Sequence, residues 1–301
     1  MSAPFASGDP LSPARATRWR LRSRWLDLPR RPLVMGIVNA TPDSFSDGGR
    51  YFAQQQAIEH GLALAAEGAD LLDVGGESTR PYSQPVPPDE EARRVVDVVR
   101  ALAERAGVPI SIDTSKAAVA REALAAGAEI INDVTALAGD PDMLGLAATS
   151  AAGVCLMHMR GTPQTMQDDP RYDDLIGEIA AFLAGRRDAC IRVGIPLERI
   201  ALDPGVGFGK THGHNVQIVA NCYRLHELGC PLLVGHSRKG FLAKVMGDKQ
   251  ADLTAGTIGA SIALALQGVQ IVRVHDVRAV RHALAVFEAV GGLTGQPVQL
   301  P

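Results

Sequence analysis

Hydrophobic and polar positions alternate in blocks along the chain. Short apolar runs, each followed at once by polar residues, occupy residues 33–38, 71–74, 109–112, 129–131, 154–157, 200–202, 232–234 and 271–274. Longer stretches with helical spacing lie between and after these runs, at residues 53–67, 89–105, 116–126, 141–151, 173–192, 215–228, 253–266 and 277–290. Strands that alternate eight times with helices predict an α/β fold with a parallel sheet, a single-domain (β/α)8 TIM barrel.

The pattern changes near the start of the chain. Residues 17–32 alternate with period two around Trp19 and Trp25, which predicts a β-hairpin that covers the N-terminal floor of the barrel. Six arginines between Arg18 and Arg31 could form a nucleic-acid patch, but solvated strand faces explain them more simply. Residues 1–16 are expected to be a disordered N-terminal tail, residues 17–292 the barrel, and residues 293–301 a C-terminal tail.

Composition narrows the possible partners. The chain has 301 residues, and a barrel takes roughly 250, so one domain accounts for nearly all of it. A formal net charge of -3 gives no electrostatic reason to expect a nucleic-acid or membrane partner. No apolar stretch approaches the ~20 residues of a membrane span, and the first residues do not resemble a signal peptide. The four cysteines lack CxxC spacing, so we expect reduced thiols in a cytoplasmic protein.

Two long loops and a cluster of donors follow the first, second and last predicted strands. Asn39, Arg273 and His275 lie at strand ends, and the loop at residues 75–81 adds glycines, hydroxyls and Arg80. Active sites of barrels lie at this end of the strands. Arginine, histidine, amide and hydroxyl donors that gather there are suited to a diphosphate. Two alternatives stay open, because Arg80 could be a solvated loop charge and the loop at residues 39–49 could be an ordinary surface loop instead of a lid.

Acceptors follow three other strands. Asp113, Asn132 and Asp203 end the third, fourth and sixth predicted strands. Such groups are costly to bury without partners, and together they suit a heterocycle with several N–H groups. Lys239 could donate to a ring carbonyl or nitrogen. One aspartate at a strand end can simply cap the next helix, as we expect for Asp276, but capping does not explain all three residues.

A metal site is the competing interpretation. His158, His236 and His275 lie at or near strand ends, where Asp113 and Asp203 could join them, and barrel metallohydrolases use such clusters. The first strand, however, ends without the His-x-His pair of those enzymes. The sequence therefore favours the heterocycle site.

At these residues the sequence resembles the dihydropteroate synthase family of pterin-binding enzymes. The first segment reads MGIVNATPDSFSDGG and the second reads DVGGESTRP. The segments that are similar in order and spacing are residues 35–49, 73–81, 112–116, 131–133, 156–161, 202–210, 237–239 and 273–276. The resemblance extends over roughly residues 20–290, and eight segments in order make it specific.

The resemblance implies a reaction. In this family 4-aminobenzoate displaces diphosphate from (7,8-dihydropterin-6-yl)methyl diphosphate and gives 7,8-dihydropteroate for folate biosynthesis. The implied enzyme is a transferase and a sulfonamide target, with these small molecules as its partners, Mg²⁺ as its cofactor and a homodimer as its assembly.

The resemblance also implies roles for individual residues. The pterin would be bound by Asp113, Asn132, Met157, Asp203, Phe208, Lys239 and Arg273. The diphosphate would be bound by Asn39, Thr79, Arg80, Arg273 and His275, and Mg²⁺ by Asn39. 4-Aminobenzoate would be bound by Phe45, Thr79, Pro81 and Ser237. The catalytic residues would be Asn39, Arg80, Lys239, Arg273 and His275.

Two positions depart from the family pattern. Val206 stands where an aromatic residue is frequent, and His236 stands where methionine is frequent. We expect neither residue to touch the proposed contact set. Two alternatives share the predicted fold: a pterin-binding methyltransferase domain, which should not need the loop at residues 75–81 or residues 237–239, and an inactive paralogue, which should have lost contact residues.

Overall fold

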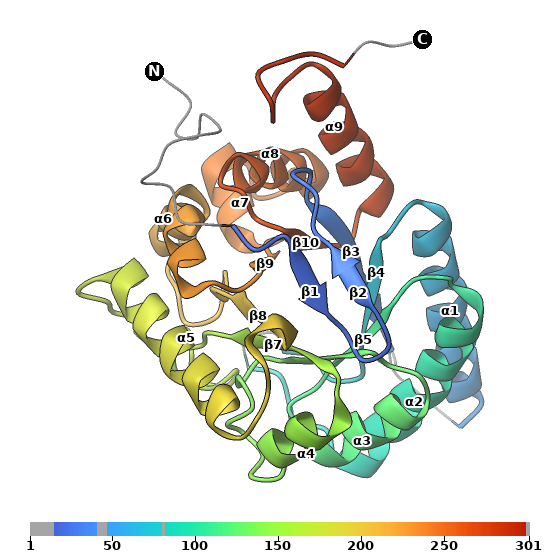
Figure 1. Cartoon of the computed structure of the whole chain (residues 1–301). Coiled ribbons are helices and arrows are strands. Elements are labelled where there is room, and N and C mark those ends of the chain that lie inside the picture. Colours follow the sequence, from blue (N-terminus) through green and yellow to red (C-terminus); the bar gives the residue numbers. More distant parts are fainter. Residues whose placement is uncertain (1–14, 41–46, 80–81, 299–301) are drawn as a thin grey trace.

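The computed structural model describes residues 15–40, 47–79 and 82–298, with side chains of the first helix described from Ala53 onward. Its centre is a sheet of parallel strands in the order β8-β7-β6-β5-β4-β3-β10-β9 (Figure 1). A parallel bridge from Leu202 to Leu232 brings the two outer strands together. The strands are β3 (Leu33–Asn39), β4 (Leu71–Gly75), β5 (Ile110–Asp113), β6 (Ile130–Asp133), β7 (Gly153–Met157), β8 (Ile200–Asp203), β9 (Leu233–Gly235) and β10 (Ile271–Val274). The predicted (β/α)8 barrel is confirmed.

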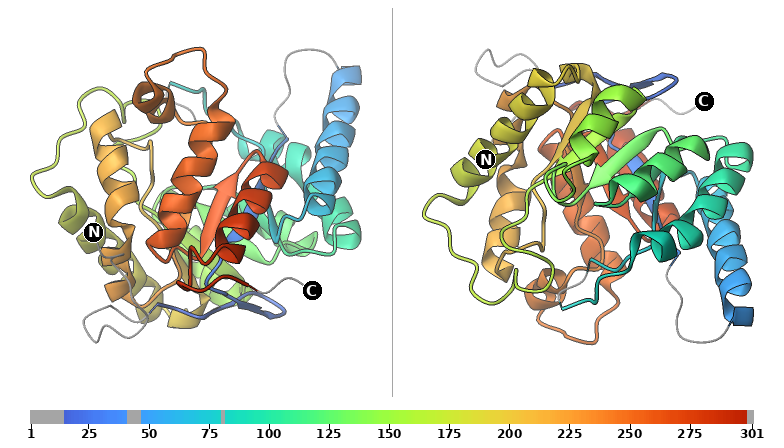
Figure 2. Two further views of the ribbon diagram at one scale, coloured as in Figure 1. Left: turned by 90° about the horizontal axis from the view of Figure 1, so that it is seen from above. Right: turned by 90° about the horizontal axis from the view of Figure 1, so that it is seen from below.

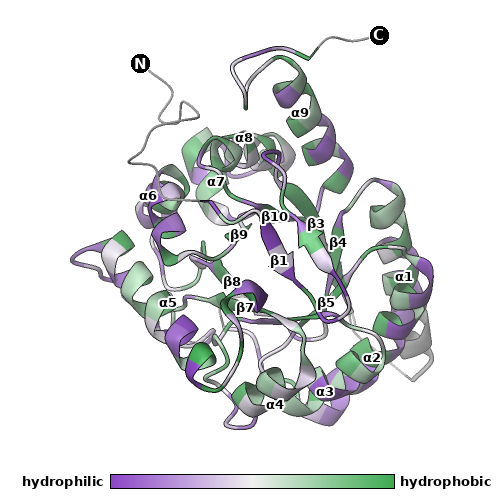
Figure 3. Cartoon of the chain, in the orientation of Figure 1, coloured by the Kyte–Doolittle hydropathy of each residue, from purple (hydrophilic) through white to green (hydrophobic). Residues whose placement is uncertain are grey.

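Helices surround the barrel and mix hydrophilic with hydrophobic residues (Figure 3). They are α1 (Asp47–Ala66), α2 (Pro88–Arg105), α3 (Ala117–Ala125), α4 (Met143–Ser150), α5 (Leu175–Arg192), α6 (His212–Asn221), α7 (Gly240–Met246), α8 (Leu253–Leu266) and α9 (Val277–Ala289), with 3-10 helices η1 (Leu197–Arg199) and η2 (Cys222–Leu228). Helix α1 begins before the predicted residue 53, and the short α7 was not predicted. Among the described residues, no helix has both the length and the apolar character needed to cross a bilayer.

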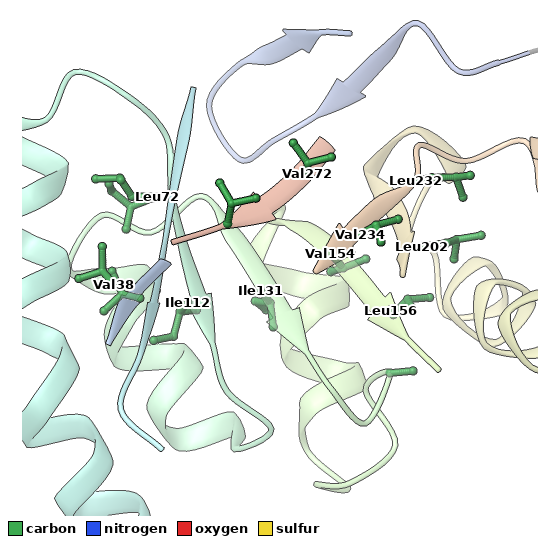
Figure 4. Close-up of a cluster of buried hydrophobic side chains, with 14 of the residues drawn as sticks. Val38, Leu72, Ile112, Ile131, Val154, Leu156, Leu202, Leu232, Val234 and Val272 are labelled. Atoms are coloured by element: carbon green, nitrogen blue, oxygen red, sulfur yellow. The ribbon is translucent and has the colours of Figure 1, made fainter. Parts of the chain in front are cut away.

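Each barrel strand has two kinds of position, those that face outward to the helices and those that face inward to the barrel interior. Outward side chains pack against the helices in one large apolar layer, part of which is drawn in Figure 4, for example Leu72, Ile112 and Ile131. Because side chains alternate along a strand, the neighbouring residues face the barrel interior. The first inward layer is apolar and contains Met35, Leu71, Ile130, Cys155, Ala201, Leu233 and Ile271.

The second inward layer lies two residues further along the same strands. Leu71 is followed by Asp73, Ile130 by Asn132, Ala201 by Asp203 and Ile271 by Arg273. This change of chemistry over two residues separates an apolar floor from a charged mouth. The mouth lies at the C-terminal ends of the strands, where we predicted the site.

The N-terminal hairpin closes the floor. Strand β1 (Arg18–Arg20) pairs antiparallel with β2 (Trp25–Asp27), and Figure 2 shows the hairpin lying across one end of the barrel. Trp19 is fully buried in the apolar floor cluster, and its indole Nε1 donates to the Arg199 carbonyl oxygen at 2.9 Å. The predicted hairpin on the floor is therefore confirmed.

The arginines of this segment have local partners. Arg18 pairs with Asp27 at 2.9 Å, and Arg24 pairs with Glu129 at 2.8 Å. Both guanidinium groups are more than half exposed, as expected for solvated strand faces. Both of these arginines thus have their charged partners within the chain.

Both predicted tails include ordered residues. Arg15 Nε donates to the Gly268 carbonyl oxygen at 2.8 Å, and the Ala16 carbonyl oxygen accepts from Gln270. Residues 15 and 16, which the predicted tail includes, thus contact the barrel, and residues 1–14 lie outside the described residues. At the other end, Val298 N donates to the Ala289 carbonyl oxygen at 2.9 Å, so residues up to 298 fold back on α9.

Candidate active site

Arg273 is the centre of the charged mouth. Its Nε donates to Asp73 Oδ2 at 2.6 Å, and its second terminal nitrogen donates to Asp113 Oδ2 at 2.8 Å. The Asn132 amide donates to the same Asp73 oxygen at 3.0 Å. Strands β4, β5, β6 and β10 are therefore tied together by one polar cluster. It contains three of the predicted pterin residues, Asp113, Asn132 and Arg273.

Burial and charge oppose one another in this cluster. Burial raises the pKa of Asp113 to about 7, with Arg273 lowering it and Asp73 raising it further. Burial alone would lower the pKa of Arg273, but the two carboxylates outweigh it and hold that pKa above its ordinary value. The site thus contains a permanent cation beside a carboxyl group that titrates near neutrality.

The other predicted pterin residues lie on the opposite wall of the mouth. Asp203 Oδ1 accepts from Gly205 N at 2.7 Å, and burial raises the pKa of this carboxyl group. Lys239 Nζ lies 4.5 Å from the centre of the Phe208 ring. Burial lowers the pKa of Lys239 to about 8 despite the nearby Asp203. Met157 pairs in register with Asp203 and is buried beside it.

One expectation about this wall is wrong. Lys239 Nζ donates to the Val206 carbonyl oxygen, so Val206 does touch the contact set, through its backbone. His236 is instead buried against α8, where its Nε2 lies 2.9 Å from the Ser261 hydroxyl oxygen. The contact at Val206 is made by its backbone carbonyl oxygen and does not depend on the side chain, whereas the His236 side chain contacts α8.

The predicted diphosphate residues gather where β10, β3 and β4 adjoin. The Ser237 hydroxyl oxygen lies 3.1 Å from His275 Nδ1 and 3.2 Å from His275 N. Asn39 ends β3 and pairs in register with Gly75, which begins the loop that carries Thr79. The neighbouring order of these three strands is as predicted.

Part of the predicted set cannot be placed. Phe45, Arg80 and Pro81 lie outside the described residues. Thr79 is described and lines a cavity of about 440 Å³ together with Asp113. This cavity extends from the mouth between the loops that follow β4, β5, β6 and β7, and it reaches Phe182 on α5.

A largely buried charge cluster that was not predicted from the sequence lies under the loop after β4. Lys116 Nζ donates to Glu77 Oε2 at 2.6 Å and also to Glu91 Oε2. Glu77 in turn accepts from Val86 N at 2.8 Å, which closes the loop between residues 77 and 86. Burial alone would lower the pKa of Lys116, but its bonds to the two glutamates raise it. The cluster thus anchors the loop that carries Thr79.

Asp73 was also missed as a site residue. It is fully buried, and it lies inside the apolar run of β4 instead of at the strand end where we looked for chemistry. A charged residue within a strand of leucines and valines was the available signal, because an isolated buried carboxylate needs a partner.

The histidines of the metal interpretation take separate partners. His158 Nδ1 lies 2.8 Å from Lys210 Nζ, and burial lowers the pKa of His158 to about 3. Lys210 is itself buried and also donates to the Pro204 carbonyl oxygen at 2.9 Å. In the described part of the chain, no group of three or more His, Cys, Asp or Glu side chains could hold a metal ion.

The fold is a barrel whose buried charged groups gather at the C-terminal ends of its strands, where barrel enzymes have their active sites. The sequence matches the family described as pterin binding enzyme over residues 35–275. The chain belongs to this family.

The chain is similar to known dihydropteroate synthases. The chain is 44% identical to the dihydropteroate synthase of Escherichia coli strain K12 over 264 residues, 88% of this chain and 93% of that protein. It resembles the Yersinia pestis dihydropteroate synthase with a sulfonamide drug complex, at TM-score 0.84 and 45% identity, over 91% of this chain and 99% of that one. A Xanthomonas albilineans dihydropteroate synthase with 4-aminobenzoic acid gives TM-score 0.83 and 46% identity, over 91% and 98%.

Proposed function

We infer that this chain catalyses the dihydropteroate synthase reaction and is a transferase of folate biosynthesis. The amine of 4-aminobenzoate forms a C–N bond to the methylene carbon of the dihydropterin substrate. The C–O bond to diphosphate breaks, its electron pair leaves with diphosphate, and the amine gives up a proton. The observation that carries this function is the cluster around Arg273, which joins pterin acceptors to a permanent cation at one barrel mouth.

The pterin lies within the charged mouth. Asp113 and Asp203 accept its N–H groups, and the Asn132 amide, which both donates and accepts, fixes the orientation of the ring. Lys239 donates to a ring acceptor, and Phe208 contributes an apolar wall beside it. Such a set holds the methylene carbon in one place, which lowers the entropic part of the barrier.

The leaving group is stabilised by the neighbouring donors. Arg273, His275 and Asn39 lie at the ends of adjoining strands, where negative charge develops on the diphosphate as the C–O bond breaks. The arylamine is already a nucleophile, so no strong base is required. The residues of the mouth need only orient both substrates, stabilise diphosphate and exclude water.

We also propose that Mg²⁺ assists through Asn39. Asn39 is exposed at the end of β3, whereas Asp73 and Asp113 are engaged by Arg273. Mg²⁺ commonly keeps several waters and takes few protein ligands when a substrate supplies phosphate oxygens, so one amide oxygen fits this role. When bound, the ion would neutralise charge on the diphosphate.

Two further proposals concern the setting of the enzyme. The cysteines Cys155, Cys190, Cys222 and Cys230 are all buried and unpaired, which supports a reducing compartment such as the cytoplasm. A homodimer is supported by exposed valines on or beside the outer helices, Val245 on α7, Val286 on α9 and Val290 directly after α9. Sedimentation equilibrium of the wild type and of Val286→Asp tests the dimer.

The test of the function is an assay with both substrates. The purified chain is mixed with dihydropterin diphosphate, 4-aminobenzoate and Mg²⁺, and 7,8-dihydropteroate is measured by chromatography. Product formation that a sulfonamide inhibits supports the proposal. Pterin binding without turnover would instead identify an inactive paralogue, and methyl transfer from methyltetrahydrofolate would identify the methyltransferase alternative.

A further inference from the structure

Asp73 has a bonding pattern that sets it apart from the other carboxylates of the mouth. Its Oδ2 alone accepts both the Arg273 guanidinium at 2.6 Å and the Asn132 amide at 3.0 Å. Its Oδ1 is buried and has no hydrogen-bond partner among the described residues. Asp73 lies beneath the rim, in the interior of β4, so it reaches the pterin through its two partners.

We propose that Asp73 is a positioning residue for the pterin, because it holds Arg273 and Asn132 in place and competes with Asp113 for the Arg273 guanidinium. This inference rests on the proposed function. It concerns a residue that donates no group to the substrate and acts only through its neighbours. Two consequences follow, one geometric and one electrostatic.

The geometric consequence concerns the two donors. Without the Asp73 carboxylate, the Asn132 amide loses its acceptor and the Arg273 side chain keeps a single anchor, Asp113. Both pterin contacts then gain rotational freedom, and a site whose contacts are misplaced by an ångström loses much of its rate. The loss falls on the pterin and not on 4-aminobenzoate, whose proposed contacts include neither Arg273 nor Asn132.

The electrostatic consequence concerns Asp113. The charged groups that face it are Arg273, Asp73, Glu91, Asp133 and Lys239. Burial raises the pKa of Asp113 to about 7, Arg273 lowers it, and Asp73 raises it. Removing the charge of Asp73 removes a repulsion, and Asp113 becomes the one ionised partner of Arg273 in this cluster. Both changes lower the pKa of Asp113. Asp113 then ionises, and accepts N–H groups from the pterin, at lower pH.

The variant Asp73→Asn separates charge from geometry. Because Oδ2 makes both bonds, the new amide oxygen can keep them while the NH2 group takes the place of Oδ1. Affinity for dihydropterin diphosphate, without 4-aminobenzoate, is measured by calorimetry from pH 5 to pH 9. In the wild type we expect affinity to rise with pH through a midpoint near 7. In Asp73→Asn we expect that midpoint to fall by about one unit.

A matched control, Asp70, lies directly before the start of the same strand. Asp70 also pairs with an arginine, Arg281, at 3.0 Å, but near the floor. Asp70→Asn should leave the midpoint of pterin binding unchanged. Asp73→Ala, which removes both bonds, should raise the KM for the pterin substrate about tenfold or more with little change in the KM for 4-aminobenzoate.

The outcomes are distinguishable. A wild-type protein that does not bind the pterin substrate contradicts the proposed function itself. Wild-type binding with the same midpoint in Asp73→Asn overturns this inference alone. If Asp73→Asn does not fold, Asp73→Ser repeats the test with a smaller neutral side chain.

Discussion

The floor and the mouth of this barrel use the same strands for opposite purposes. At the floor, Leu71 and Ile271 pack with Trp19 in a cluster without charge. Two residues further along, Asp73 and Arg273 face the same interior. The floor removes apolar surface from water, which is the dominant favourable contribution to folding. The mouth buries carboxylates and cations whose pKa values move away from their ordinary ranges, as is typical of functional sites.

The difference indicates where stability and function are in conflict. A charge that is buried to meet a ligand is costly until the ligand arrives, whereas an apolar floor is favourable at all times. We therefore expect floor substitutions to lower the free energy of unfolding without changing substrate affinity. Mouth substitutions should change substrate affinity without lowering the free energy of unfolding, and Lys116 is the exception.

Trp19→Ala should produce the largest effect and test the floor. Trp19 fills the floor cluster and donates to Arg199, so truncation creates a cavity and leaves an acceptor unpaired. We expect a loss of roughly 3–5 kcal/mol in the free energy of unfolding. Urea denaturation measures it, and the KM values of the folded fraction should match the wild type. A changed KM would mean that the floor also shapes the mouth.

Lys116→Met should depart from this pattern and lower both stability and substrate affinity, because Lys116 lies at the mouth and also stabilises its structure. The substitution leaves Glu77 and the fully buried Glu91 without their shared cation. Loss of one partner of a buried pair costs roughly 3–5 kcal/mol. The loop that carries Thr79 should also loosen, so the KM for 4-aminobenzoate should rise more than the KM for the pterin substrate. Lys116→Arg is the control and should keep most of both properties.

Asp203→Asn should sharpen the comparison in the opposite direction. The amide loses the charge that faces the pterin, and affinity should weaken by on the order of 1–3 kcal/mol. Burial raises the pKa of Asp203, so its ionised form opposes folding, and the variant should be as stable as the wild type or more so. Calorimetric titration and thermal melts give the two values. Unchanged pterin affinity would remove Asp203 from the site.

Asp113→Asn should have an effect on stability that depends on pH. The folded-state pKa of about 7 lies above the ordinary value of 3.8, so the folded protein binds more protons between these values and loses stability as pH rises through them. At pH 5 the folded wild type is protonated at Asp113 and resembles the variant, whereas at pH 8 it carries the buried charge. Denaturation at both pH values should show that the substitution is more favourable at pH 8.

Arg18→Gln should have the smallest effect. The Arg18 pair with Asp27 is largely exposed on the outer face of the hairpin. Exposed pairs contribute roughly 0–1 kcal/mol, so we expect a change of less than about 0.5 kcal/mol in the free energy of unfolding and no change in turnover. A larger loss would show that the hairpin surface, and not only Trp19, holds the floor.

The sequence predicted the barrel and much of the mouth because both follow from one rule. Asp113 and Asp203 end their strands and Asn132 is the last residue but one of β6, so all three were found at the edge where the parallel strands of a barrel meet. Asp73 was missed because it lies before the strand end, and its partners come from strands far away in the sequence.

Other features could not be predicted from local patterns. Glu91 gave no signal in the sequence, because it is one of three acidic residues in the first turn of α2 and only the folded chain shows that it is buried. The short helix α7 begins at Gly240, a poor helix former, so its propensity gave little signal. The contacts of Arg15 are with backbone carbonyl groups that come near it only when the chain has folded.

The hairpin covers the floor of the barrel, so the mouth is the end from which substrates would enter. In the layout proposed above, the pterin rests on the second inward layer, directly above the hydrocarbon of the floor, and 4-aminobenzoate sits nearer the rim beside Thr79 and Ser237. A molecule at the rim then blocks passage to the deeper position. Premature arrival of 4-aminobenzoate would give a dead-end complex, whereas arrival of the pterin first leaves the route open. Exit follows the reverse path, so the bulky product must clear the same rim before another cycle begins.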